Sequence, residues 1–379
     1  MSADCIVVGA SFAGVACATA LARRGHAVVV LERKADPGDK LHTTGILVKD
    51  AIDQVPLLDA MPGALVRRVP GVRLYAPDLS HVDLAAPGYY FLATDTPALM
   101  RWLAAQAVAA GAQLRTGTLF REASRTTHGF EVEGHGPCRY LVGADGPQSR
   151  VAKVTGLGQN RQFLFGIEHE YTDVDLAAPD HLHCFIDRRL APGYIGWMVA
   201  GVGVVQVGLA GRLGPVDAGG ARRLRGVLPP QAAMLAFLEK IAPIADFRSR
   251  TPDAVRAGQI PCGGVVRPVA AARTLLLGDA AGMVSPLTAG GIHTALRHGA
   301  AAGHAIGDFL SGRAEDPSRG FVASYPTFRV KRALRWVFDH FQADWAFNLL
   351  LGSRAMRAAA SLVYFHRKGV FEPGRGRGD

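Results

Sequence analysis

Short apolar runs, each followed by a glycine turn and a helical pattern, recur along this chain. Residues 5–9 form a continuous apolar run, which is typical of a parallel strand buried on both faces. Residues 15–25 continue with a helical pattern that ends at a glycine, and residues 27–31 give a second apolar strand. Residues 140–143 and 275–277 repeat the pattern of a strand entering a turn. These alternations predict an α/β fold with a parallel sheet.

One uncharged stretch, residues 191–211, is long enough to span a bilayer. It contains six glycines and a run of valines, with a turn-like Ala-Gly-Val-Gly sequence at residues 200–203. Two β-strands joined by a hairpin explain this composition better than a membrane helix does.

Further elements follow from the same kind of pattern. Residues 98–111 predict a helix that ends in glycine, and strands are expected near Thr118 and at residues 130–132. Helical patterning dominates the end of the chain. The spacing i, i+4, i+7 and i+11 predicts one face of a helix there, formed by Leu334, Phe338, Phe341 and Trp345.

The turn after the first strand has the composition of a dinucleotide-binding loop. Gly9 and Gly14 allow the backbone to approach a pyrophosphate at a helix N-terminus. Glu32 ends the next strand, 18 residues after Gly14, where a carboxylate can accept a hydrogen bond from an adenosine ribose hydroxyl. Ser11 occupies the middle glycine position of the G-x-G-x-x-G pattern, and its Cβ atom narrows the space through which the backbone approaches the pyrophosphate. A plain strand-turn-helix connection is the alternative.

Two later segments have similar features. A strand leads into Gly278 and Asp279, and a Gly-Gly pair at residues 290–291 then opens a helix. Between the two ends of the chain, another strand leads into a Gly-Asp-Gly turn at Asp145, which alone would be an ordinary turn. Phosphate-type loops so far apart suggest one long phosphate-bridged ligand, and flavin adenine dinucleotide (FAD) fits that requirement.

Together the three segments resemble the fingerprints of the flavin-dependent family that includes p-hydroxybenzoate hydroxylase and geranylgeranyl reductase, from residue 3 to about residue 305. The resemblance implies that the first loop holds the pyrophosphate and adenosine, through Gly9, Ser11, Phe12, Ala13, Gly14, Glu32 and Arg33. It places Asp145 near the pyrophosphate and the path of the reductant. It assigns the ribityl chain and flavin to Gly278, Asp279, Gly290, Gly291 and Ile292.

The resemblance also implies a substrate side and an electron donor. The segment Gly-Tyr-Ile-Gly-Trp at residues 193–197 resembles the Gly-Tyr-x-Trp strand pair of the geranylgeranyl reductase branch, so Tyr194 and Trp197 are candidates for a substrate pocket. Packing of a sheet against helices is the alternative role for each of them. NAD(P)H is the expected electron donor.

The expected fold is a discontinuous Rossmann-like FAD-binding domain with a mostly antiparallel substrate-domain sheet and a helical C-terminal segment. The FAD-binding domain is expected at residues 1–75, 95–158 and 265–320, the substrate domain at 76–94 and 159–264, and the helical segment at 321–379. The Gly-Arg-Gly-Arg-Gly-Asp tail is expected to be disordered.

Composition bounds the location and the partners. The five cysteines are scattered without a C-x-x-C pair, and the chain starts directly on a strand. These features favour a reducing cytoplasm, with no disulfide framework, metal site or signal peptide. Residues 321–379 carry ten Lys/Arg and four Asp/Glu within a net charge of +10. This basic end could form a peripheral membrane contact, attract an anionic substrate or be a solvated face; no nucleic-acid motif accompanies it.

Two departures from the resembled family bear on the chemistry. Residues 42–46 contain no cysteine where those reductases have a Cys-Gly-Gly-type segment, and Thr96 stands where the family commonly has arginine. His42 and His293 are weak candidates for proton relay. The sequence does not identify a catalytic acid.

The favoured function is FAD-dependent reduction of a double bond in a small hydrophobic, isoprenoid-type substrate. The alternative within the same family is an FAD-dependent monooxygenase that hydroxylates a hydrophobic or aromatic substrate. An NAD-dependent dehydrogenase, which would need only the first loop, and a flavin- or lipid-binding protein without turnover are the other hypotheses.

Overall fold

In the computed structural model, which describes residues 2–216, 222–224 and 228–365, the apolar N-terminal run forms β1 (Ala3–Val8) inside a mostly parallel sheet. β1 pairs in parallel with β2 (Val28–Leu31) and β11 (Gly136–Gly143). β8 (Gln113–Arg115) and β19 (Thr274–Leu276) extend the sheet, also in parallel. Antiparallel additions are β18 (Ala270–Ala271), β10 (Phe130–Val132) and β9 (Ala123–Arg125). The strand expected near Thr118 lies earlier, as β8.

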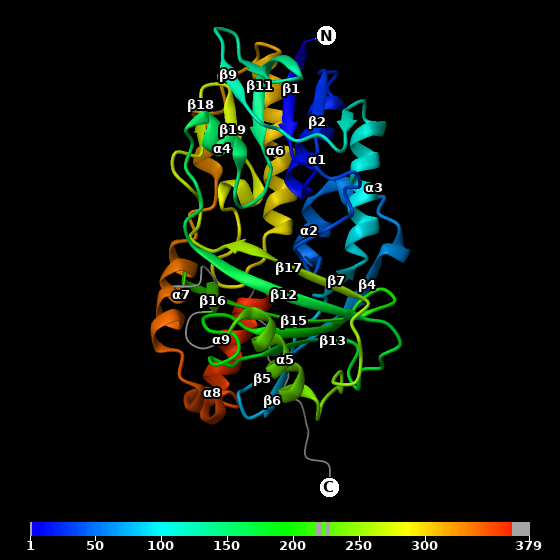
Figure 1. The fold of residues 1–379 in the computed structure, drawn as a ribbon, viewed down its shortest axis with the longest axis vertical. Helices are drawn as coiled ribbons and strands as arrows, with labels where there is room; N and C mark the ends of the chain where they lie inside the picture. Colours follow the sequence, from blue (N-terminus) through cyan, green and yellow to red (C-terminus); the bar gives the residue numbers. More distant parts are fainter. Residues whose placement is uncertain (1, 217–221, 225–227, 366–379) are drawn as a thin grey trace. The chain divides into compact units, whose positions relative to one another are not determined.

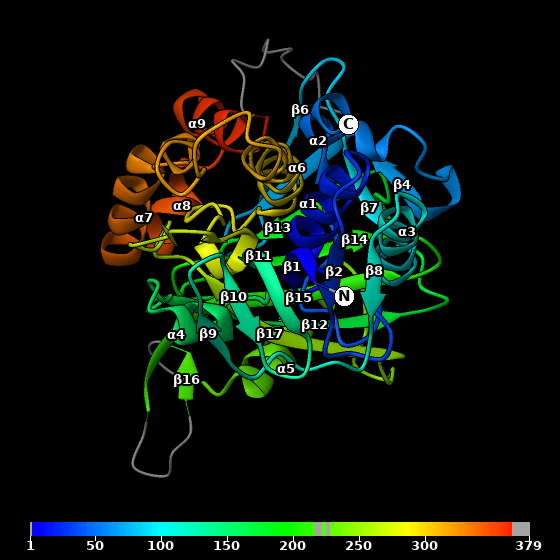
Figure 2. The ribbon, with the colours of Figure 1, turned by 90° about the horizontal axis from the view of Figure 1, so that it is seen from above.

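Three long helices accompany this sheet, and α1 (Phe12–Ala22) packs against both of the others, α3 (Thr96–Ala109) and α6 (Ile292–Leu310) (Figures 1 and 2). The contact between α1 and α6 is close because glycines of α6 face α1. A Cβ atom on Gly299 would lie 2.4 Å from the Ala13 carbonyl oxygen, and one on Gly303 would lie 2.6 Å from that of Cys17. The backbone of the helix that follows the first loop is therefore fixed against α6.

The shorter elements around this sheet connect its strands and helices. They are β3 (Ile46–Val48), α2 (Lys49–Gln54), η1 (Pro56–Leu58), η2 (Gly63–Leu65), α4 (Arg150–Thr155), η3 (Gly278–Ala281) and η4 (Phe321–Ser324).

A second sheet is mostly antiparallel, as expected, in the order β17-β12-β15-β14-β13-β5-β6. Its strands are β5 (Gly71–Tyr75), β6 (His81–Ala85), β12 (Phe163–Tyr171), β13 (His181–Phe185), β14 (Gly196–Ala200), β15 (Val205–Val216) and β17 (Ala254–Pro261). β16 (Arg222–Leu224) pairs with β15. β7 (Phe91–Thr94) lies between β3 and β4 (Val66–Val69) in a separate three-stranded sheet.

The uncharged stretch at residues 191–211 forms the hairpin that its glycines predict. β14 pairs antiparallel with β15, and Gly203 in the turn between them has a φ of +71°. α5 (Pro230–Ile241) covers the face of this sheet that carries Gly196, against which the Phe237 ring packs. None of the described helices is both long and apolar enough to cross a membrane.

The contacts divide the chain into two units, each made of three segments. The first contains residues 1–65, 94–166 and 256–338, and the second contains residues 66–93, 167–255 and 339–379. The expected boundary after residue 75 lies earlier because β5 pairs with β6 and β13 of the antiparallel sheet. β12 and β17 each have residues in both units. The C-terminal segment expected at residues 321–379 is divided between the units.

The predicted single helix through Leu334 and Trp345 is wrong. α7 (Arg329–Phe341) ends before α8 (Asp344–Leu350) begins, and α9 (Arg354–Phe365) follows. Leu334 and Trp345 are both exposed, so they do not form a core-facing stripe. The tail that was expected to be disordered lies outside the described residues.

Candidate functional site

The first glycine loop and the Asp145 segment are in direct contact. Ser11 caps α1, since its Oγ accepts a hydrogen bond from the Gly14 N–H, and the same hydroxyl donates to the Ala144 carbonyl over 2.9 Å. Gly9 has a φ of +102°, and a Cβ atom there would lie 2.3 Å from that carbonyl oxygen. The small residues of the loop therefore let the ends of β1 and β11 approach each other.

The third segment joins the same place. A Cβ atom on Gly278 would lie 3.1 Å from the Ala13 Cβ, next to the first loop. The Asn160 side-chain amide donates to the Asp279 carbonyl over 2.8 Å and to the Pro147 carbonyl over 3.1 Å. This amide links the second and third segments, and the sequence analysis missed it because no motif marks a single asparagine. Loops from three distant parts of the chain thus converge at the carboxyl ends of the parallel strands β1, β11 and β19.

Glu32 lies at the end of β2 beside the first loop. Its buried carboxylate accepts hydrogen bonds from the Ala10 N–H at 2.8 Å and from the Lys34 N–H at 2.9 Å. A carboxylate oxygen has more than one acceptor position, so a ribose hydroxyl could still be bound. The neighbouring Arg33 is exposed to solvent.

Asp279 differs from the other acidic residues of the site. Its carboxylate has no hydrogen-bond partner among the described residues, and burial raises its pKa from 3.8 to about 6. The residue is partly exposed, so a ligand that covers its carboxylate must replace water with a hydrogen-bond donor of its own. The hydroxyls of a ribityl chain are donors of this kind. The Asp279 carboxylate is therefore suited to bind the ribityl chain of FAD.

Asp145, in contrast, is fully engaged within its own segment. Its carboxylate accepts from the Ser149 hydroxyl at 2.6 Å and from the N–H groups of Arg150 and Val151, which begin α4. Burial raises its pKa, although these hydrogen bonds favour the charged form. Its side chain shapes the turn and the start of α4.

The Gly-Gly pair opens α6, as its position in the sequence suggests. Gly291 is the N-cap residue, and no side chain caps the helix there. The preceding loop is closed by Ser285, whose N–H donates to the Gly290 carbonyl and whose hydroxyl accepts from the Thr288 N–H. The helix N-terminus therefore presents backbone N–H groups with a partial positive charge.

The two candidate histidines have packing and hydrogen-bonding roles. His42 is exposed, and a Cβ atom on Gly258 would lie 2.7 Å from its Cβ. The Nε2 atom of His293 lies 3.1 Å from Oε1 of Gln54. Neither geometry identifies a proton donor.

The two departures from the resembled family meet in the structure. Gly45, at the end of the cysteine-free segment, packs directly against Thr96, whose Oγ1 would lie 1.8 Å from a Cβ atom on that glycine. The Thr94 hydroxyl donates to the Gly45 carbonyl at 2.7 Å and lies 3.0 Å from the Thr96 hydroxyl. An arginine at position 96 would have to displace this segment, so the two changes are structurally coupled.

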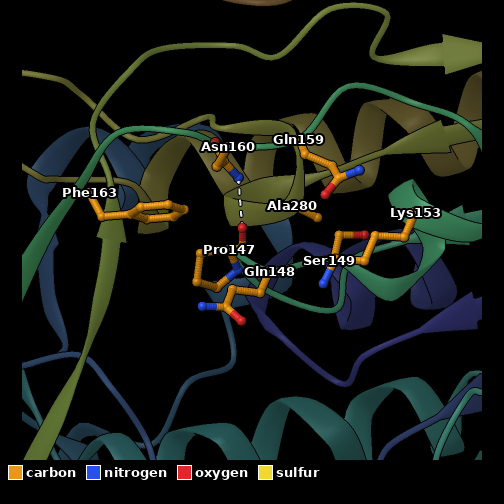
Figure 3. Close-up of a pocket in the computed structure, with 8 residues that line it drawn as sticks. All are labelled: Pro147, Gln148, Ser149, Lys153, Gln159, Asn160, Phe163 and Ala280. Carbon is orange, nitrogen blue, oxygen red and sulfur yellow. Dashed lines mark hydrogen bonds between the residues drawn. The ribbon is translucent and has the colours of Figure 1, made fainter. Parts of the chain in front are cut away.

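A pocket of about 180 Å³ opens beside the Asp145 and Asp279 segments (Figure 3). Its wall contains the cation of Lys153, the ring of Phe163 and several amide side chains. The lining residues are Pro147, Gln148, Ser149, Lys153, Gln159, Asn160, Phe163 and Ala280. The pocket can take a ligand with both an anionic group and a planar ring.

The candidate substrate residues lie in the second unit. Trp197 of β14 is half-buried, and its indole N–H donates to Oε2 of the buried Glu168 over 2.8 Å. Gly208 of β15 makes room for this indole, since a Cβ atom there would lie 2.5 Å from the ring. Tyr194, just before β14, is also half-buried. Both residues are therefore partly exposed in or beside β14 of the second sheet.

Several known proteins align with most of this chain. The digeranylgeranylglycerophospholipid reductase 2 of Methanopyrus kandleri is 28% identical over 337 residues, which cover 86% of this chain and 81% of that protein. A geranylgeranyl bacteriochlorophyll reductase-like protein from Thermoplasma acidophilum superposes with a TM-score of 0.79 at 16% identity and covers 97% of each chain.

A probable FAD-dependent monooxygenase from Pseudomonas aeruginosa, PqsL, superposes with a TM-score of 0.67 at 18% identity over 96% of this chain and all of that one. At these identities the two solved structures establish the fold. Residues 2–337 match the family model for the FAD binding domain (FAD_binding_3). With its converging loops, the chain therefore belongs to this FAD binding domain family and is a flavin-dependent oxidoreductase.

Proposed function

We propose that this protein reduces carbon–carbon double bonds in a hydrophobic isoprenoid lipid, using FAD and NAD(P)H. The main structural support is the meeting of three distant loops at Asp279, whose partnerless carboxylate suits a polyhydroxyl chain. The lipid class is inferred from relatives named digeranylgeranylglycerophospholipid reductases. When bound and reduced, FAD would supply the hydride for one carbon of the double bond, and a proton would complete the reduction at the other carbon.

In this proposal, the residues at the converging loops hold the cofactor. The N–H groups at the start of α1 would hold the pyrophosphate, Glu32 would accept a hydrogen bond from the ribose, and Asp279 would accept one from the ribityl chain. The N-terminus of α6 favours negative charge on the flavin ring. The proposed FAD-binding residues are Gly9, Ser11, Phe12, Ala13, Gly14, Glu32, Arg33, Asp145, Gly278, Asp279, Gly290, Gly291 and Ile292.

The pocket in Figure 3 is proposed to receive the electron donor. Lys153 can bind an anionic phosphate group, and the Phe163 ring offers a surface for an aromatic ring. Gln148, Gln159 and Asn160 can exchange hydrogen bonds with a carboxamide. Lys153→Ala should therefore raise the KM for NADPH about tenfold while leaving the flavin content unchanged.

The lipid is proposed to contact the sheet that carries Tyr194 and Trp197. The hydrogen bond from Trp197 to Glu168 fixes the indole plane, so its face is available to an apolar chain. This proposal places the protein in the cytoplasm, at the surface of a membrane that holds the lipid.

Hydroxylation by an FAD-dependent monooxygenase is the second candidate function. The observation that favours it is the coupled pair Gly45 and Thr96, which replaces the segment and the arginine of the resembled reductases. The reductase proposal remains first because relatives named as reductases match this chain over most of its length.

Turnover with a geranylgeranyl lipid distinguishes the two functions. The purified holoenzyme is reduced by NADPH without oxygen, the lipid is added, and the product is analysed by mass spectrometry. Reductase activity predicts reoxidation of the flavin and a product that has gained hydrogen. Oxygen uptake coupled to a hydroxylated product, with no anaerobic turnover, would overturn the proposal. Asp279→Ala, which should lose FAD, is the inactive control.

A further inference from the structure

The apolar face of α7 is exposed to solvent. Val330, Leu334 and Val337 occupy positions i, i+4 and i+7, which form one face, and they are 72%, 47% and 48% exposed. Arg335 lies on the opposite face and is 3% exposed. Its Nη1 donates to the carbonyl of Pro286, in the loop before α6. An ordinary surface helix has the reverse arrangement.

The next helix, α8, repeats this exposure. Trp345 and Leu349 lie four residues apart and are 71% and 73% exposed. Of the twelve large hydrophobic residues that are exposed in the described chain, eight lie in α7, α8 and α9. Monomeric proteins rarely concentrate exposed apolar residues in this way unless the surface contacts a partner or a membrane.

Cations accompany the apolar stripe. Arg329 and Arg332 are exposed on α7, and Arg354 is exposed at the start of α9. Within the described residues, none of these three guanidinium groups forms an ion pair with a carboxylate. The segment 321–379 contributes +6 of the net charge of +10. Exposed arginines beside an apolar face complement anionic phospholipid headgroups.

We propose that α7 lies in the surface of an anionic phospholipid membrane, with Val330, Leu334 and Val337 among the upper acyl chains. Trp336, which is exposed beside the stripe, lies at headgroup level, where indole rings are favoured. Arg329, at the edge of the stripe, contacts lipid phosphates. The proposal rests on the proposed function only for the idea that the substrate is a membrane lipid.

A second copy of the chain is the competing occupant of this stripe. Pairing through it would bring arginines of the two copies together. The one acidic residue of α7, Asp339, does not face them, because it is turned inward and pairs with Arg212. Like-charged groups disfavour such a contact, whereas anionic lipids neutralise them. The charges therefore favour the membrane.

Vesicle flotation of the FAD-loaded full chain tests the proposal. Wild-type protein should float with vesicles of phosphatidylcholine and phosphatidylglycerol, and binding should weaken in high salt or with phosphatidylcholine alone. The double variant Leu334→Gln/Val337→Gln should bind at least about tenfold more weakly, because two apolar side chains no longer enter the bilayer. Arg329→Gln should weaken the preference for the anionic vesicles.

Val108→Gln is the matched control, since Val108 is 49% exposed on α3, far in sequence from the stripe. It should bind vesicles as the wild type does. Thermal unfolding and flavin absorbance confirm that each variant is folded and holds FAD. The proposal is overturned if wild-type protein does not bind anionic vesicles, if the stripe variants bind unchanged, or if the stripe variants instead abolish a concentration-dependent dimer. Reduction of a detergent-dispersed lipid tests the catalytic proposal separately.

Discussion

At the scale of single residues, Asp279 gives the FAD-free protein a distinct pH dependence. Its folded pKa of about 6 exceeds the unfolded value of 3.8, so between these values the folded state retains a proton that the unfolded state has lost. The stability is therefore greatest below the unfolded pKa and falls as pH rises through the folded pKa, by on the order of 2 kcal/mol. Urea unfolding of the apoprotein between about pH 4 and about pH 7 measures this loss.

Asp279→Asn provides the control for that pH dependence. An amide does not titrate, so this variant should lose the contribution from position 279 while the rest of the profile is retained. An unchanged profile in the variant would show that another group is responsible.

A comparison of Gly9 with Gly25 distinguishes the cost of a steric clash from the cost of a positive φ. Both glycines have positive φ, but a Cβ atom on Gly9 would meet the Ala144 carbonyl, whereas one on Gly25 would meet nothing within 4 Å. Gly25→Ala should therefore cost about 1 kcal/mol, and Gly9→Ala more than about 3 kcal/mol. Gly9→Ala should also lose bound FAD. Denaturant unfolding and the ratio of flavin to protein absorbance measure both effects; equal costs would contradict the close approach.

At the scale of elements, the crossing of α1 and α6 depends on Gly303. A Cβ atom there would lie 2.6 Å from the Cys17 carbonyl and 2.7 Å from the Ala20 Cβ. Gly303→Val should push the helices apart and cost about 3 kcal/mol. His304→Val, at the next and exposed position of the same helix, should change stability by no more than about 0.5 kcal/mol. Comparable losses in the two variants would indicate a general effect of valine in α6.

The sequence predicts the elements around the cofactor well because their constraints are local. A strand buried on both faces must be apolar throughout, and a loop that closely approaches other backbone needs glycine, so β1, Gly9 and Gly278 are visible in the sequence. Asn160 and the side-chain engagement of Asp145 are not visible. Their roles depend on which distant backbone groups the fold brings within hydrogen-bond distance.

The C-terminal helices show a different limit. The sequence predicts one helix face from the apolar positions of α7, and such spacing usually marks a core-facing stripe. The structure instead buries Arg335 and exposes Leu334. Periodicity identifies a helix face but does not say whether protein or another medium covers it. The break before α8 carries neither glycine nor proline, so no strong stop signal marks the end of α7.

At the scale of the whole molecule, neither unit is a continuous piece of chain. The backbone passes between the units five times, and β12 and β17 have residues in both. Disruption of one unit therefore releases the ends of strands that the other unit needs. This connectivity favours cooperative unfolding over independent melting of the two units.

FAD should consequently stabilise the second unit, although its proposed site lies in the first. At a hundredfold excess over Kd, a ligand adds about 2.7 kcal/mol, which would raise Tm by a few degrees. In the double variant Trp102→Phe/Trp336→Phe, the remaining tryptophans, Trp197 and Trp345, both report on the second unit. With FAD, the Tm followed by their fluorescence should rise by the same amount as the Tm followed by flavin release. A tryptophan transition that ignores FAD would show that the units unfold separately, because mass action stabilises only the part that unfolds together with the binding site.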